Sequence, residues 1–307
     1  MDKITCKVCN KEFEGDLNFH KHLKSHKYTQ AEYYQKFFPR YDAYDETIIR
    51  YKNKEYYFGT YFNSKSNFKR WLSNKTPKEC QEYVYKFLTA RKVRKELIYS
   101  PSQAELKTLM MPGIKYIDER LGGYNAICEK IGFKLRFNKK SLDAKEFKNI
   151  LNKVIFSDTR EQRPLDFDNQ TRKEGLSFGD YRMAGSEVYI ERKSIADAWG
   201  TLTGGFNRFE KEVIRAKDAN AYLVILIEGP FSELEKFPLQ KQVAGKIKIS
   251  VEFVYHSIRE LMQKYQHIQF LFVKNREEAS RVIQKMFAAD NQVKDVDMQL
   301  AYDIGQL

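Results

Sequence analysis

The segment GDYRMAGSEVYIERKSIAD, residues 179–197, is the part of the sequence that most constrains the fold, because its pattern predicts a β-hairpin that carries charged side chains. Its central part, EVYIERK, is short and is β-branched and aromatic at its centre, which predicts a β-strand. Side chains alternate between the faces of a strand, so Glu191 and Lys193 point to one face and Arg192 to the other. The preceding GDY is expected to lead into the partner strand of a hairpin, which places Asp180 near Glu191. Two acids and a lysine therefore lie at one edge of a predicted cleft.

Another acid follows a second apolar run, because Asp158 comes shortly after Val154, Ile155 and Phe156. Carboxylate oxygens are suitable ligands for Mg²⁺ or Mn²⁺. Such an ion produces a hydroxide nucleophile and neutralises the charge that builds up on a phosphate. Acids at strand ends together with one lysine therefore suit metal-assisted cleavage of a phosphodiester. The alternative is a charged hairpin face in solvent, but each of these side chains lies on an apolar strand or at its end.

Four motifs in this half of the chain resemble those of the XPF-type endonuclease family, whose hallmark is GD followed by ERK-x3-D. They are DTRE (158–161), GDY (179–181), ERKSIAD (191–197) and NRFEKEVIRA (207–216). The resemblance covers roughly residues 152–289 and follows the order of the family. It implies a restriction-endonuclease-like α/β core that hydrolyses DNA with the help of Mg²⁺ or Mn²⁺.

The resemblance also assigns roles to single residues. Asp158, Asp180 and Glu191 would hold the metal ion. Lys193 would orient or activate the attacking water. The further residues that it implicates are the supporting Arg160, Glu161, Arg192 and Asp197 and the DNA-contacting Arg208 and Arg215.

Two points stay open at this level. Arg160 and Asp197 could form structural salt bridges instead of acting in the site. Members of the family commonly dimerise through the nuclease domain, which makes the expected helices 250–265 and 277–288 candidate surfaces for a homodimer. The sequence does not distinguish a homodimer from a monomer.

Strands and helices alternate through the nuclease half. The expected strands are 154–156, the two strands of the GDY–ERK hairpin, 222–227 and 268–273, and the expected helices are 143–152, 207–218, 250–265 and 277–288. The apolar runs at 222–227 and 268–273 are continuous, as in strands buried on both faces. A loop is expected at 201–206. The alternation predicts a mixed α/β sheet flanked by helices.

Residues 4–26 contain two cysteines and two histidines at the spacing of a small metal-binding module. Cys6 and Cys9 enclose two residues. Twelve residues follow before His22, and three more lead to His26. Two sulfur and two nitrogen ligands favour tetrahedral Zn²⁺. The segment resembles the two-cysteine, two-histidine zinc finger, a ββα module that would serve either as a DNA contact or as a fold staple or protein-docking element.

Two small modules are predicted between the finger and the nuclease half. Residues 28–75 are rich in aromatic and basic side chains, and their rings either form a core or stack on bases. Expected there are a helix from Thr29 to just before Pro39, a helix at 64–72, and strands at 48–49, 56–58 and 61–62. Residues 76–137 have the helix order of a helix-turn-helix unit, with helices expected at 78–95, 100–109, 114–121 and 125–131. The segment GGYNAICEKIGF within it is similar to the short helical repeats found beside homing endonuclease domains.

The chain is therefore expected to divide into six parts. They are the zinc finger 1–27, an aromatic-rich basic α+β module 28–75, a helical module 76–137, a linker 138–151, the nuclease domain 152–289 and a C-terminal tail 290–307. The tail is short and acidic and has no counterpart of the tandem helix-hairpin-helix module that the family often carries. DNA binding is accordingly expected to lie in the N-terminal half.

The net charge of +13 is consistent with that placement. The whole excess lies in residues 1–150, whereas residues 151–307 carry equal numbers of basic and acidic side chains. Basic side chains neutralise phosphates and supply most non-specific affinity for nucleic acid, although here they could also serve only solubility. No apolar run is long enough for a membrane span, and the N-terminus has no signal-peptide core. Cys80 and Cys128 lack the spacing of metal ligands and are expected to be buried.

These features predict a metal-dependent DNA endonuclease with Mg²⁺ or Mn²⁺ at the acids and Zn²⁺ at the finger. Its substrate would be branched DNA in recombination or repair, or a specific duplex site, as in a phage or mobile-element nuclease. The expected location is the cytoplasm of a bacterial or phage-infected cell, or the nucleus of a eukaryote. One alternative is a non-cleaving DNA-binding or scaffold protein, which would lack a metal-binding acid, and none is missing here. Another is an RNA-directed nuclease.

Overall fold

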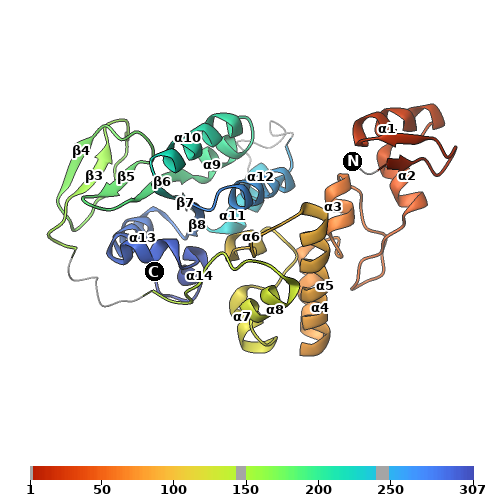
Figure 1. Ribbon diagram of the computed structural model, residues 1–307, viewed down its shortest axis with the longest axis horizontal. Helices are drawn as coiled ribbons and strands as arrows, with labels where there is room; N and C mark the ends of the chain where they lie inside the picture. The colour runs from red at the N-terminus through yellow and green to blue at the C-terminus, as the bar shows by residue number, and fades with distance from the viewer. Residues whose placement is uncertain (1–2, 143–149, 240–248) are drawn as a thin grey trace. The chain divides into compact units, whose positions relative to one another are not determined.

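The computed structural model describes residues 3–142, 150–239 and 249–307 (Figure 1). The chain forms two compact units, Met1–Glu82 and Tyr83–Leu307, a coarser division than the six parts expected from the sequence. The helix expected at 143–152 falls mostly outside the described residues. None of the helices in the described ranges has both the length and the apolar composition needed to cross a membrane.

The first unit begins with a small ββα arrangement. Strands β1 and β2 pair antiparallel, and helix α1 together with the 3-10 turn η1 carries both histidines of the motif. The described elements that follow are helices. The bounds in this unit are β1 Lys3–Thr5, β2 Glu12–Glu14, α1 Asp16–Leu23, η1 Lys24–His26, α2 Gln30–Phe37, α3 Lys54–Gly59, α4 Lys65–Asn74 and the start of α5, Pro77–Lys95.

Side-chain caps explain where two of these helices begin. Thr29 and Glu32 form a capping box at the start of α2, each accepting a backbone N–H of the other. The side chain of Ser64 accepts the N–H of Asn67 at the start of α4. Both helices agree with the prediction from the sequence.

The strands predicted at 48–49, 56–58 and 61–62 are wrong. Residues 54–59 form helix α3 instead, because the side chain of Asn53 accepts the N–H of Tyr56 and caps a helical turn. Ile48 makes an isolated bridge to Tyr41 without extending into a strand. Side chains of this region that suggested strands, such as Ile49 and Tyr57, are instead buried in the core.

One hydrophobic core joins the finger to the helices after it. Phe19 and Leu23 of α1 pack with Tyr33 of α2 and Tyr57 of α3, and all four side chains are fully or almost fully buried. The hydroxyl of Tyr33 accepts the N–H of Lys7, which lies between the two cysteines, at 2.7 Å. The finger therefore shares its hydrophobic core with the helices that follow it. The aromatic rings of this region form that core.

The second unit is built on a six-stranded mixed sheet flanked by helices, as predicted (Figure 1). The strand order is β4-β3-β5-β6-β7-β8; β4 is parallel to β3, β5 is antiparallel to both of its neighbours, and β6, β7 and β8 are parallel. The strands are β3 Ile155–Asp158, β4 Thr171–Glu174, β5 Tyr181–Met183, β6 Val188–Ser194, β7 Tyr222–Glu228 and β8 Ile268–Val273. The helices are α6 Gln103–Lys107, α7 Ile114–Arg120, α8 Tyr124–Ile131, α9 Ile195–Leu202, α10 Phe206–Asp218, α11 Phe231–Lys236, η3 Phe237–Leu239, α12 Val251–Lys264, α13 Arg276–Ala289, η4 Asp290–Lys294 and α14 Met298–Asp303.

The central strands are buried on both faces. On β7, Leu223 and Ile225 pack in the core formed with α9, α10 and α12, whereas Val224 and Leu226 pack in the core formed with α13 and α14. This alternation explains why the sequence of β7 is a continuous apolar run. Helix α9, which the sequence did not predict, runs to Leu202 and shortens the loop expected at 201–206.

Helices α6 to α8 pack into the same unit as the sheet. The buried guanidinium of Arg136 donates to the carbonyls of Met262 and Tyr265 and so satisfies the C-terminal end of α12. The N–H of Gln103 donates to Asp297 at 2.6 Å, which joins α6 to the start of α14. The helical module and the sheet therefore share one body.

Residues 290–307 also belong to this body. Helix α14 places Met298 and Ala301 in the core beside β8, and the C-terminal Leu307 is buried as well. The segment expected to be a tail thus packs against the sheet. Cys80 and Cys128 are both buried, as predicted.

Candidate active site and metal centre

Asp180 is fixed by three hydrogen bonds where β5 meets β3 and β6. Its N–H donates to the carbonyl of Ile190 at 2.7 Å, and its own carbonyl accepts the N–H of Asp158 at 2.8 Å. Its carboxylate Oδ2 accepts the N–H of Arg192 at 2.8 Å. The hairpin register therefore holds Asp180 next to the part of β6 that carries Glu191.

Gly179 makes this close approach possible. Its φ of 69° lies in the left-handed region that favours glycine. A Cβ at this position would stand 3.1 Å from the carbonyl oxygen of Ile190. The N–H of Gly179 donates to Oε1 of Glu212 on α10, at 3.2 Å. The glycine of the GDY motif is thus required both by its turn and by the neighbouring strand.

Glu191 and Lys193 share one face of β6, as strand alternation requires. The Lys193 ammonium lies 2.7 Å from Oε1 of Glu191 and 5.1 Å from the centre of the Phe209 ring. Burial raises the pKa of Glu191, and the nearby charge of Asp180 raises it further. Burial raises the pKa of Asp180 as well. Two carboxyl groups that resist ionisation side by side are a favourable place for a cation.

Asp158 is buried, but it is turned toward Arg160. The guanidinium of Arg160 contacts both carboxylate oxygens, with the shortest distance 2.5 Å, and the backbone N–H of Arg160 adds a contact of 2.7 Å. These hydrogen bonds hold the pKa of Asp158 below its usual range. The Arg160 side chain is 72% exposed, whereas that of Asp158 is 2% exposed. Asp158 already has a cationic partner, one that solvent can reach.

Arg192 and Glu161 lie together on the other face of the sheet. Arg192 contacts Glu161 at 2.8 Å and Glu228 at 2.9 Å, and Arg276 joins the same group at 3.3 Å from Glu228. Glu161 also accepts the N–H of Arg163. The structure therefore places Arg192 and Glu161 in an ion-pair network that secures the carboxyl ends of β6 and β7, apart from the contact between Lys193 and Glu191.

Asp197 and the two candidate DNA-contacting arginines lie at helix surfaces. Ser194 caps α9 by accepting the N–H of Asp197, and its hydroxyl donates to the Asp197 carboxylate at 2.6 Å. Arg208 and Arg215 are exposed on α10. Asp197 thus takes part in a helix cap, whereas both arginines are open to solvent.

Glu212 is the site residue that sequence reasoning missed. Its carboxylate binds Gly179, and its charge contributes to raising the pKa of Glu191. The sequence holds a signal for it. Phe209 and Val213 form the buried stripe of α10, and an acid three residues after Phe209 lies on that same inward face.

The residues around β5 and β6 fit a hard divalent cation. Oxygen ligands are available on Asp180 and Glu191, which lie close enough that the charge of Asp180 adds to burial in raising the pKa of Glu191. Asp158 would join them if Arg160 moved away. Within the described residues, these acids do not gather as tightly as the cysteines and histidines of the finger.

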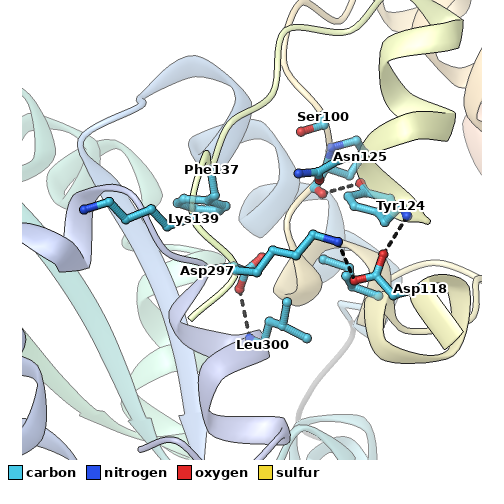
Figure 2. A pocket seen from close by; sticks show the side chains of 11 residues that line it. Ser100, Asp118, Tyr124, Asn125, Phe137, Lys139, Asp297 and Leu300 are labelled. Carbon is cyan, nitrogen blue, oxygen red and sulfur yellow. Dashed lines mark hydrogen bonds and ion pairs between the residues drawn. The ribbon is translucent and has the colours of Figure 1, made fainter. Parts of the chain in front are cut away.

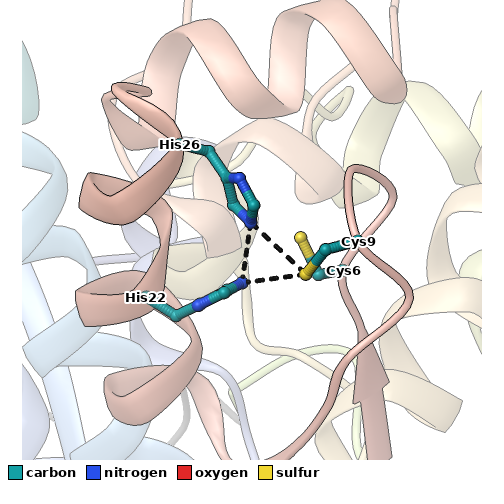
Figure 3. Close-up of side chains that lie close together, drawn as sticks. All are labelled: Cys6, Cys9, His22 and His26. Carbon is teal, nitrogen blue, oxygen red and sulfur yellow. Dashed lines mark hydrogen bonds between the residues drawn. The ribbon is translucent and has the colours of Figure 1, made fainter.

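The four ligand atoms of the finger lie within 4.8 Å of one another (Figure 3). The sulfur of Cys9 is 3.3 Å from Nε2 of His22 and 3.3 Å from Nε2 of His26, and the two histidine nitrogens are 3.0 Å apart. A tetrahedron built on Zn–S bonds of about 2.3 Å and Zn–N bonds of about 2.0 Å has edges of roughly 3.3–3.8 Å. The spacing of Cys6, Cys9, His22 and His26 therefore fits Zn²⁺.

A separate cavity lies between the helical module and α14 (Figure 2). Its volume is about 30 Å³, the order of a single water molecule. Asp118 there accepts the N–H of Tyr124 at 2.7 Å and lies 3.6 Å from Lys140, while Asp297 accepts the N–H of Leu300. The acids that line this cavity have partners within the protein, and the cavity is too small for a substrate.

Comparison with known protein families finds a match in the part of the chain that forms the sheet. Residues 142–286 match the ERCC4 domain. The ERCC4 match contains all six strands of the sheet together with α9 to α12 and most of α13. No curated protein sequence matches the chain.

Two solved structures of XPF from Aeropyrum pernix are similar to part of the chain. One is 21% identical with a TM-score of 0.35, and the similarity covers 46% of this chain and 68% of that one. The second, a complex with DNA, is also 21% identical with a TM-score of 0.35, over 44% of this chain and 63% of that one. Both likenesses are weak.

Proposed function

We propose that the protein is a metal-dependent DNA endonuclease that hydrolyses phosphodiester bonds. The observation that carries the proposal is the group formed by Asp180, Glu191 and Lys193 at the junction of β5 and β6. It lies inside the ERCC4 match, which indicates a nuclease. The resemblance of DTRE, GDY and ERKSIAD to the XPF-type motifs supports the same conclusion.

Each side chain of the group has a role that its surroundings favour. Asp180 and Glu191 would hold Mg²⁺ or Mn²⁺, which supplies a nucleophilic hydroxide and offsets the charge of the phosphate. Lys193 is held by Glu191 and Phe209, so its ammonium is positioned to orient the attacking water or a phosphate oxygen. Asp158 would become a third ligand once Arg160 releases it, and Arg160 would then be free to contact the phosphate backbone.

The surface of α10 is the candidate path for the DNA strand. Arg208 and Arg215 are exposed on this helix, one turn before and nearly one turn after Glu212, which contacts the turn of the site. The basic residues ahead of the sheet would add non-specific affinity. The substrate is branched DNA, or a specific duplex site in a phage or mobile-element context.

We further propose that Cys6, Cys9, His22 and His26 bind Zn²⁺. The distances among their ligand atoms support this. The packing of the finger against α2 and α3 favours a role as a structural staple within the first unit. A DNA contact by the finger surface is compatible with that role.

The test is cleavage of labelled duplex, flap, splayed-arm and four-way-junction DNA by the full-length protein in Mg²⁺, with EDTA and an RNA substrate as controls. Asp180→Asn and Lys193→Ala are each expected to reduce cutting at least a thousandfold while DNA binding survives. Asp218→Asn, an exposed acid at the end of α10, is the matched control and is expected to cut normally.

The outcomes separate the alternatives. Metal-dependent cuts near a branch would make the substrate structure-specific, and cuts only in one duplex sequence would make it site-specific. Normal cutting by both site variants would reject the assignment of the site. Tight DNA binding without cutting of any substrate would favour a non-cleaving DNA-binding or scaffold protein, and cutting of RNA alone an RNA-directed nuclease.

A further inference from the structure

Glu212 is a half-buried polar side chain at the edge of the apolar face of α10. Phe209, Val213 and Ala216 of this helix are buried in the core against the sheet, and the half-buried Glu212 borders this stripe. A carboxylate at such a position is costly unless it is hydrogen-bonded. Its observed hydrogen bond is from the N–H of Gly179, 3.2 Å from Oε1. The helix therefore reaches the turn that precedes β5.

That turn has little freedom of its own. Gly179 has a left-handed φ of 69°, and a Cβ at this position would stand 3.1 Å from the carbonyl oxygen of Ile190. The next residue, Asp180, donates its N–H to the same Ile190 carbonyl. The Gly179–Asp180 peptide is thus held by β6, and the Phe178–Gly179 peptide before it is held by Glu212.

From this geometry we infer that Glu212 is a positioning residue, which fixes the Gly179–Asp180 turn so that the Asp180 carboxylate is presented to the metal ion. The inference rests on the proposed function, because it names a further residue of the same site. Glu212 acts through the backbone of Gly179, so we expect the loss of its hydrogen-bonding oxygen to matter more than the loss of its charge.

The chain offers a matched control on the same helix. Glu210 lies two residues earlier, and its carboxylate contacts Lys264 at 2.8 Å and the Tyr265 hydroxyl at 3.0 Å. It ties α10 to α12 and makes no contact with the Gly179 turn. Loss of Glu210 removes a comparable tether of α10 without releasing Asp180.

Three variants of the full-length protein test the inference: Glu212→Gln, Glu212→Ala and Glu210→Ala. The readouts are Mn²⁺ affinity by titration calorimetry without DNA, single-turnover cleavage, and thermal stability. Glu212→Ala is expected to weaken Mn²⁺ binding about tenfold and to slow cleavage by at least as much. Glu212→Gln keeps an oxygen acceptor and is expected to stay within about threefold of the wild type. Glu210→Ala is expected to change only stability.

The result that would overturn the inference is equal Mn²⁺ affinity in Glu212→Ala and the wild type. A loss in Glu212→Gln as large as in Glu212→Ala would also overturn it, because charge and not position would then be responsible. An equal loss in Glu210→Ala would reduce Glu212 to general support of the helix.

Amide hydrogen exchange of Gly179 separates this inference from the proposed function. Glu212→Ala is expected to speed exchange at Gly179 at least tenfold, and Glu212→Gln much less, whether or not the protein cuts DNA. If the wild type neither binds Mn²⁺ nor cuts, the proposed function fails, and the exchange rates still show whether Glu212 holds the turn. Unchanged exchange in Glu212→Ala would reject the positioning role by itself.

Discussion

The finger and the acid site are both candidate metal centres, but the chain assembles them in different ways. The finger takes its ligands from one hairpin and the helix that follows, so sequence spacing alone brings them within 4.8 Å of one another. The acid site takes its side chains from β3, the turn before β5, β6 and α10. Its geometry depends on sheet register and on a helix far along the chain.

The two sites also differ in what surrounds the ligands. The finger ligands are close together in one cluster, where Cys9, His22 and His26 lie within hydrogen-bonding distance of one another. At the acid site, Arg160 already contacts Asp158 and Lys193 already contacts Glu191. A metal ion at the finger would therefore complete a fold, whereas a metal ion at the acids would have to compete with cations that the protein supplies.

Removal of zinc is expected to have the largest effect. Ligation in such modules is worth on the order of 10 kcal/mol, as much as the whole stability of a typical domain. Because Phe19 and Leu23 share a core with Tyr33 and Tyr57, chelation should unfold α2 and α3 together with the finger. Near-ultraviolet circular dichroism and limited proteolysis would show this loss with the second unit still intact.

Addition of zinc to the chelated protein is the control and should restore the signal. Unchanged near-ultraviolet dichroism in protein shown to contain no zinc would contradict the prediction. It would mean that the aromatic core holds the finger in place without help from the metal.

The contrast between the two sites also explains how far the sequence could be read. The spacing of the cysteines and histidines was sufficient to predict the ββα order of the finger, and the continuous apolar runs were sufficient to predict β7 and β8. The strands predicted at 48–49, 56–58 and 61–62 failed because the cap at Asn53 outweighed the aromatic composition. A local hydrogen bond thus determined the secondary structure of this segment.

Long-range geometry set the limit at the acid site. Motifs located Asp158, Asp180, Glu191 and Lys193, and strand alternation correctly placed the last two on one face. The packing of α10 that brings Glu212 to Gly179 depends on the whole sheet, so the spacing of the motifs did not contain it. The same holds for Arg136, which joins the helical module to α12.

Removal of the Arg160 side chain is expected to have an intermediate effect that sharpens the contrast. Arg160→Ala leaves the buried carboxylate of Asp158 without its cation, which is unfavourable until another cation binds. Mn²⁺ affinity measured by calorimetry should therefore rise about three- to tenfold. In the Asp158→Asn background the same change should have no effect. An unaltered affinity in Arg160→Ala would show that Asp158 is not a metal ligand.

Truncation of the first unit is expected to have the smallest effect, because the basic excess is divided between the two units. Residues 83–142 carry many of the lysines and arginines and pack with the sheet, so they remain when residues 1–76 are removed. Each lost phosphate contact lowers the slope of log affinity against log salt by about 0.9. The truncated protein should keep about half of that slope, measured by fluorescence anisotropy with duplex DNA. A slope equal to that of the full chain would place DNA binding on the second unit alone. A slope near zero would instead show that the first unit, which contains the finger, supplies the affinity for DNA.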